Sequence, residues 1–309
     1  MKSLIPFIAV FFIFMKISLA QATPSRELER LNFFPNADAY LIAQYDHVRL
    51  NIETPFEEIQ TKEVNNYYNL FTLTYAQHVS RKMFLGLRGT FEQSSENAAS
   101  YGVPVRRRFT GMGFKEPEIF TQYRLRFQKE EKGLIDLYLG YSPLLGKREV
   151  GGSDAKRLNG RDILTIGLSH GLWEEEWEFK SALNFRFFGE GKEENSYAEG
   201  SFQLESYYMI NFQFHTQYRI NPKLYTFGSV GFNYTSIEVI SGGTFGRREV
   251  QAGTGSLFEL GLKRTLGDWS LLELSYNLHR YDYFVKGETF NLDGDAIQQQ
   301  FTLALKQAF

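Results

Sequence analysis

The 309-residue chain contains no cysteine. It therefore cannot form a disulfide framework, a thiolate metal site or a lipid anchor attached through cysteine. Proline is scarce, at 8 residues, and a formal net charge of −2 offers no bulk attraction for nucleic acid. Beyond residue 22, no apolar run approaches the roughly 20 residues of a membrane-spanning helix. These absences exclude disulfide-rich, nucleic-acid-binding and helical membrane proteins.

The first 22 residues have the organisation of a secretory signal peptide. Lys2 precedes an apolar run over 4–15, and Ala20 and Ala22 have the small-residue spacing of a cleavage site. About a dozen apolar residues are too few to cross a bilayer as a helix. We therefore expect cleavage after Ala22 and a mature chain outside the cytoplasm.

The rest of the chain is rich in aromatic residues and alternates between polar and apolar positions. Aromatic residues make up 16% of the chain, with 29 Phe and 18 Tyr, and they favour strands over helices. Period-2 alternation over segments of about 10 to 16 residues predicts β-strands. Twelve segments show this pattern: 39–52, 66–79, 83–94, 117–128, 134–145, 162–172, 176–188, 201–220, 223–237, 255–266, 269–284 and 296–309.

The connections between these segments alternate between short and long. Five are short enough for hairpin turns, such as Ser80 to Lys82 and Asn221-Pro222, and the other six have about 11 to 22 residues. This asymmetry is typical of all-β transmembrane up-and-down antiparallel β-barrels, with short periplasmic turns and long extracellular loops. An even number of strands places both ends of residues 39–309 on the periplasmic side. For residues 23–38 we predict a periplasmic segment with a short helix, capped by Thr23 or Ser25.

Polar and apolar side chains lie on opposite faces of the predicted strands, and this separation indicates which face contacts lipid. In the segment 83–94, Leu85 and Leu87 lie on one face, whereas Arg88 and Glu92 lie on the other. Side chains fill a barrel of about eight strands, but a barrel of twelve encloses more volume than an apolar interior can pack. We therefore expect the apolar face to contact lipid and the polar face to line a lumen.

The last strand carries an ending with a family resemblance. Phe309 is preceded by apolar residues at every second position upstream in Leu305, Leu303 and Phe301, although Gln307 departs from this pattern. The chain resembles the Gram-negative outer-membrane β-barrel proteins, in which such an ending is an assembly signal. The resemblance implies the barrel-assembly machinery and periplasmic chaperones as partners, in addition to outer-membrane lipid. Basic side chains in the long loops are expected to face lipopolysaccharide phosphates.

Strand alternation predicts a set of inward-facing titratable side chains. These candidate lumen residues are Arg88, Glu92, Glu118, Arg124, Arg126, Asp136, Glu178, Lys180, Arg186, Glu205, His215, Arg219, Glu259, Lys263, Glu273 and His279. Their signs are nearly balanced, which argues against a strong single-sign field. Arg124, Arg126 and Arg186 are candidate anion contacts, because the guanidinium group matches a carboxylate or phosphate.

A channel for passive passage of small polar solutes is the function that this pattern favours. Two alternatives remain open: a closed structural or adhesive barrel that acts through its loops, and a lipid-active enzyme. For the enzyme, Ser169-His170 is the tempting pair, but adjacent strand residues point to opposite faces and cannot hydrogen-bond to each other. We expect no catalytic residue, no metal site and no cofactor. The sequence does not determine the oligomeric state.

Overall fold

A computed structural model describes residues 38–56, 59–80, 82–99, 106–128, 133–150, 158–174, 176–195, 200–242, 246–251, 253–267, 269–287 and 291–309. Within these ranges the chain folds into a single sheet of 17 strands. In the same ranges, no helix is long and apolar enough to cross a membrane. The predicted signal peptide 1–22 lies outside the described residues, as does the N-terminal segment 23–38 up to its last residue.

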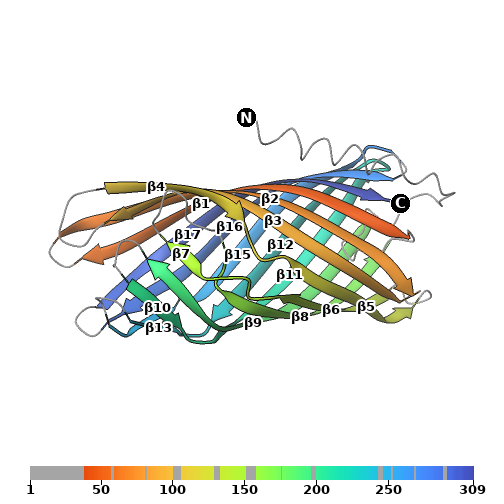
Figure 1. The fold of residues 1–309 in the computed structure, drawn as a ribbon. Coiled ribbons are helices and arrows are strands. Elements are labelled where there is room, and N and C mark those ends of the chain that lie inside the picture. The colour runs from red at the N-terminus through yellow and green to blue at the C-terminus, as the bar shows by residue number, and fades with distance from the viewer. Residues whose placement is uncertain are drawn as a thin grey trace, which may run out of the picture.

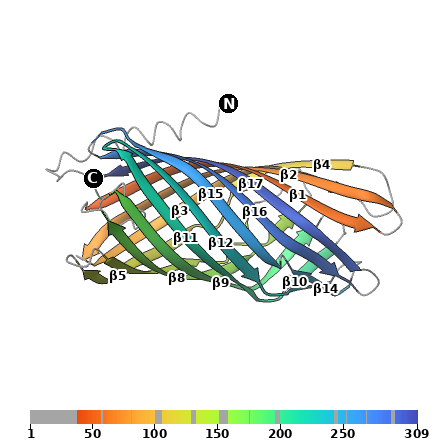
Figure 2. The ribbon, with the colours of Figure 1, turned by 180° about the vertical axis from the view of Figure 1, so that it is seen from behind.

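Twelve of the strands close into an antiparallel ring (Figure 1). In order around the ring they are β1 Ala39–Phe56, β2 Ile59–Ser80, β3 Met83–Ala99, β5 Glu118–Gln128, β6 Gly133–Ser142, β8 Arg161–Glu174, β9 Trp177–Asn195, β11 Tyr207–Asn221, β12 Leu224–Thr235, β15 Thr254–Thr265, β16 Ser270–Lys286 and β17 Asn291–Ala308. Each predicted strand corresponds to one of them, so the twelve-stranded barrel is confirmed. Figure 2 shows β11, β12, β15, β16 and β17 side by side in the opposite wall.

The five remaining strands lie in or beside the segments that the sequence predicts as long loops. They are β4 Arg106–Phe114, β7 Arg148–Val150, β10 Gly200–Leu204, β13 Glu238–Gly242 and β14 Arg248–Gln251. They extend the wall beyond the ring at the end opposite the short turns, which we call the long-loop end; the other end is the short-turn end. The predicted segment 201–220 is interrupted at Glu205 and Ser206. Before the break, β10 pairs with β13, whereas β11 pairs with β12 after it.

The ring closes along a seam between its first and last strands. β1 and β17 pair without interruption from Tyr40 opposite Ala308 to Glu53 opposite Asp295. At the short-turn end the N–H of Phe309 donates to the carbonyl of Ala39 at 2.9 Å. The seam satisfies the backbone groups of both strands, which an unpaired edge in lipid could not do.

The outer surface of the ring is apolar over most of its length. Large hydrophobic side chains that point away from the lumen remain exposed, and together they form the apolar belt: Leu85, Leu87, Ile119, Leu139, Ile166, Leu168, Leu183, Phe212, Phe214, Val230, Phe232, Phe258, Leu260, Leu262, Leu274, Tyr276, Phe301 and Leu303. A soluble protein rarely exposes so large a contiguous apolar area. The belt is the lipid-contacting surface of a transmembrane barrel.

Aromatic side chains pack against the inner wall near the short-turn end. Tyr40, Phe84 and Phe120 are fully buried together with Ala76. Gly86 makes room for them, because a Cβ atom at this position would lie 2.3 Å from Cζ of Phe120. Near this end, packed aromatic rings therefore cover the inner face of β1, β3 and β5.

Candidate functional site

A polar cavity of about 470 Å³ lies inside the barrel, lined by side chains of β3, β5, β6, β8, β9 and β11. Six of the sequence-predicted lumen residues line it: Arg88, Glu118, Asp136, Lys180, Arg186 and His215. Neutral polar groups complete the lining, among them the amides of Asn184, Asn211 and Gln213. The polar faces of these six strands thus surround a water-accessible space.

Both carboxylates that line the cavity are held by arginines. The guanidinium of Arg88 donates to Glu118 at 2.6 Å, and the two residues are direct register partners on β3 and β5. Arg124 donates to Asp136 from two nitrogens, at 2.9 and 3.4 Å, across β5 and β6. The two-point contact between Arg124 and Asp136 fixes both side chains against the wall. The negative charges of the cavity are therefore compensated before any solute enters.

Two further cations line the cavity on β9. Lys180 lies near Asp136, whose charge acts on its ammonium group. Arg186 projects into the lumen, and within the part of the chain that the structure describes it has neither an ion pair nor a side-chain hydrogen bond. Its register neighbours on β8 and β11 are Thr165 and Met209, which carry no charge. The guanidinium of Arg186 is consequently available to a ligand.

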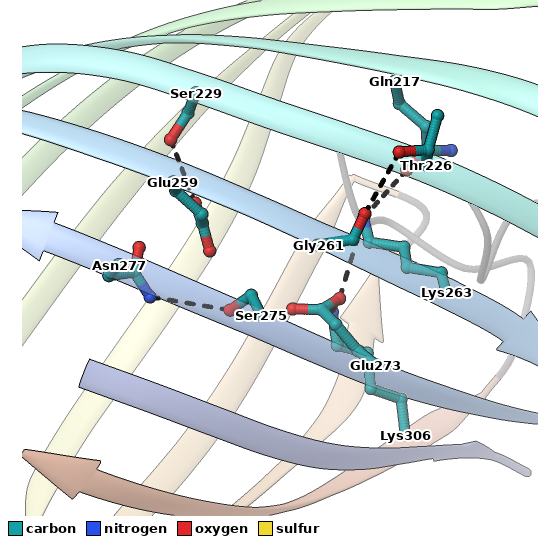
Figure 3. Close-up of polar contacts among 10 residues, drawn as sticks. All are labelled: Gln217, Thr226, Ser229, Glu259, Gly261, Lys263, Glu273, Ser275, Asn277 and Lys306. Atoms are coloured by element: carbon teal, nitrogen blue, oxygen red, sulfur yellow. Dashed lines mark hydrogen bonds and ion pairs between the residues drawn. The ribbon is translucent and has the colours of Figure 1, made fainter. Parts of the chain in front are cut away.

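A second charged cluster lies on β15, β16 and β17, close to the short-turn end (Figure 3). The Glu273 carboxylate accepts from Nζ of Lys306 at 2.7 Å and lies 3.7 Å from Nζ of Lys263. Lys263 is 4% exposed and also donates to Gln217 on β11 at 2.8 Å. Two lysines thus share the Glu273 carboxylate, and the charges of Glu178 and Glu259 also act on Lys263.

Neutral side chains contact the other titratable residues of this wall. Ser229 donates to Glu259 at 3.0 Å (Figure 3), and His279 is bonded to Asn233. These contacts place the sequence-predicted Glu259 and His279 on the inner wall, but outside the cavity lining. They stiffen the wall without adding an ion pair.

The remaining predicted lumen residues are dispersed. Glu92 pairs with Lys115 at 2.7 Å on the long-loop side, whereas Glu178 and Arg219 lie near the turns of the short-turn end. Arg126 lies on β5, but its side chain is outside the described set. Glu205 falls in the break between β10 and β11, where it lies outside any strand and its side chain is exposed. Strand alternation does not apply where the strand is interrupted.

Sequence reasoning missed Asp46 as a lumen residue. It is 3% exposed on β1 and accepts from Thr302 at 2.6 Å and from Gln300 at 3.0 Å across the seam, as well as from Gln44. Asp46 lies six residues, or three steps of strand alternation, after the inward-facing Tyr40, so it could have been assigned to the inner face. Its partners are neutral, so no opposite charge marks it in the sequence.

Arg161 is one of the basic residues that the sequence places in a long loop, just before the predicted strand 162–172. It begins β8, is 4% exposed and pairs with Glu238, while its guanidinium lies 5.0 Å from the ring centre of Tyr207. It also donates to the carbonyl of Glu205 at 3.1 Å, which ties the strand break to the wall.

Other basic groups of the long-loop end are likewise paired with acids. Lys147 pairs with Glu194, and Arg247 lies 3.5 Å from Glu249. Arg148 lies 3.6 Å from Glu193. These cations are thus partly neutralised within the chain, and their contact with lipopolysaccharide stays a prediction.

Ser169 and His170 do not form a catalytic pair. Ser169 lines the cavity, whereas His170 is exposed on the outer face of β8, as strand alternation predicts. Across the described ranges, no group of three or more His, Asp and Glu residues could hold a metal ion.

Comparison with known proteins identifies the fold. No protein-family model and no curated protein sequence matches the chain. The structure is similar to an outer-membrane channel from Pseudomonas putida F1, with a TM-score of 0.64, 10% sequence identity and coverage of 94% of this chain and 100% of that chain. It is also similar to the transport unit of the autotransporter AIDA-I from Escherichia coli, with a TM-score of 0.58, 9% identity and 97% coverage of both chains. The translocator domain of the autotransporter NalP from Neisseria meningitidis has a TM-score of 0.51 and 11% identity, with 90% of this chain and 91% of that chain covered. At such identities the similarity concerns the fold alone.

Proposed function

We propose that this protein, which has the fold of outer-membrane β-barrels, is a channel for the passive passage of small polar solutes. The observation that carries the proposal is the polar cavity of about 470 Å³ inside a ring whose outer surface is apolar. A barrel that served only as a membrane anchor would have no need of an unfilled, charged interior. The volume falls in the range of small-molecule sites.

The chemistry of the lining supports polar rather than apolar solutes. Charged groups and the amides of Asn184, Asn211 and Gln213 face the cavity. These groups exchange hydrogen bonds with water and with a hydrated solute at similar energy, so a solute enters without a large desolvation cost. The fold and the predicted signal peptide support a location in the outer membrane, reached through periplasmic chaperones and the assembly machinery.

One observation favours a second candidate, a barrel closed to solutes. Tyr40, Phe84 and Phe120 pack together near the short-turn end, and the Lys263, Glu273 and Lys306 cluster lies at the same end. Together these groups narrow the lumen on that side. In this reading, the protein would act through its long-loop end, as a structural or adhesive barrel.

Conductance of the purified protein in a planar lipid bilayer distinguishes the two functions. A channel gives discrete current steps of constant size with a linear dependence on voltage. A closed barrel gives no steps across a wide voltage range, and that result would overturn the proposal. Incorporation into the bilayer is checked independently by the shift in electrophoretic mobility between unheated and boiled samples.

A further inference from the structure

We propose that the channel selects small organic carboxylates, and that Arg186 is the station that binds them inside the cavity. This inference rests on the proposed channel function, but it concerns the binding site, which is measurable without current. It differs from the balanced lumen that the sequence predicts, because the structure shows which charges are already paired.

The surplus charge of the cavity is positive. Its two carboxylates, Glu118 and Asp136, are engaged by Arg88 and Arg124 at 2.6 and 2.9 Å. Three cations, Arg88, Lys180 and Arg186, line the cavity against these two carboxylates, and Arg124 adds a further cation beside Asp136. A cavity whose cations outnumber its carboxylates in a low-dielectric wall concentrates anions and repels cations.

The surroundings of Arg186 are largely polar, and the Glu118 carboxylate that faces the same cavity is already engaged by Arg88. Arg186 stands in a row with Thr165 on β8 and Met209 on β11. In the next row toward the short-turn end, Asn184 pairs with Asn211, and both amides line the cavity. The guanidinium fork matches the two oxygens of a carboxylate, and the amides offer hydrogen bonds to the rest of a polar molecule.

Other cations lie on the inner wall between Arg186 and the short-turn end. Lys180 lies six positions from Arg186 on β9, which is about 20 Å along a strand, so the two groups are separate stations rather than one site. Lys180 interacts electrostatically with Lys306, and His215 beside it with Lys263. An anion released by Arg186 would therefore next meet Lys180 and then Lys263 and Lys306, which lie beside Asp136 and Glu273.

The carboxylates of the opposite wall do not cancel this effect. Asp46, on β1, lies six strands away around the ring and is enclosed by Gln300 and Thr302, which donate to it at 3.0 and 2.6 Å. Glu273 is shared by two lysines. The fixed negative charges are thus screened by their own donors, whereas Arg186 faces open space.

The test compares the wild type with Arg186→Gln and with a control, Arg280→Gln. Arg280 is an exposed residue of β16 that pairs with Asp295 outside the cavity lining, so the control removes the same charge elsewhere. In a potassium chloride gradient, the reversal potential of the wild type is expected to show chloride to be more permeant than potassium. Arg186→Gln is expected to lower that permeability ratio by about fivefold, the effect of one unit charge at about 4 Å in water. Arg280→Gln leaves it unchanged.

A second measurement needs no current. In a neutral detergent, the ¹⁹F signal of trifluoroacetate, a small carboxylate, is expected to broaden with the wild type and with Arg280→Gln, but not with Arg186→Gln. If the protein gives no current but the broadening still depends on Arg186, the channel function is overturned and the binding station is kept. Current without anion preference, or broadening that survives Arg186→Gln, would overturn the station and leave the channel function intact.

Discussion

Lys306 donates to the carboxylate of Glu273 from the neighbouring strand, with 2.7 Å between Nζ and Oε2. The same carboxylate oxygen lies 3.7 Å from Nζ of Lys263. One carboxylate therefore contacts two ammonium groups on the inner wall, so a substitution of Glu273 disturbs both contacts at once.

Glu273→Gln is expected to destabilise the barrel by about 3 kcal/mol, because it leaves two poorly solvated cations facing each other. The free energy of unfolding is measured by urea titration of the protein in lipid vesicles. The matched control is Glu249→Gln, which breaks the more exposed pair with Arg247 and should cost less than about 1 kcal/mol. Equal effects of the two substitutions would show that the cluster is solvated like a surface pair.

Gly86→Ala is expected to cost about 1 to 3 kcal/mol through overpacking. The added Cβ would lie 2.3 Å from Cζ of Phe120, whose ring is buried. Gly89→Ala on the same strand is the control, since a Cβ there meets nothing within 4 Å. Urea unfolding of Gly86→Ala combined with Phe120→Leu should recover part of the loss. Additive effects in the double variant would argue against this contact.

Leu260→Arg is expected to destabilise the folded barrel by about 2 to 4 kcal/mol, because it places a charge on the lipid-facing surface of β15. Leu260 is 54% exposed and lies between Phe258 and Leu262 on the apolar belt. Thr254→Arg, on the same face but at the long-loop end of β15, should cost about 0 to 1 kcal/mol. The measurement is the urea midpoint in vesicles. If both variants unfolded at the wild-type midpoint, the belt would not contact lipid.

Deletion of Phe309 is expected to lower the amount of folded barrel in the outer membrane roughly tenfold, the effect of two lost hydrogen bonds. Phe309 donates to Ala39 and accepts from Asp38 at 3.0 Å, so its backbone holds the end of the seam. The control is Phe301→Ala, which removes one lipid-facing side chain and keeps the backbone. The folded fraction is read from the electrophoretic mobility of unheated membrane samples. Equal levels of the two variants would count against a special role for Phe309.

The barrel could be predicted from the sequence because alternation and connection length are local properties. In 83–94 the apolar face at Leu85 and Leu87 is visible without knowledge of any neighbour. The extra strands could not be predicted in this way. β10 and β13 pair with each other over only three residues each, and such short strands carry too few positions for a period to appear. The break at Glu205 depends equally on a partner, the guanidinium of Arg161, from another strand.

The sequence predicts which side chains face the lumen, but it does not predict which of their charges are paired. Alternation places Arg88, Glu118 and Arg186 on the inner wall, but only strand register shows that the first two are opposite each other. Register depends on the whole ring, since a shift by one residue would reverse every face. The freedom of Arg186 is likewise a property of its neighbours Thr165 and Met209, which lie on other strands.

The seam has a consequence for how the chain folds. Asp46 and Thr302, which bond across it, are 256 positions apart in the chain. Joining such distant segments carries the largest loop-closure entropy of any contact in the ring, and contacts of high sequence separation slow folding. Pairing of neighbouring hairpins is local and therefore fast, whereas the ring gains its last ladder only when β17 reaches β1. Closure of the seam is thus the slow, cooperative step, and until it occurs both edge strands remain open to pairing with other chains.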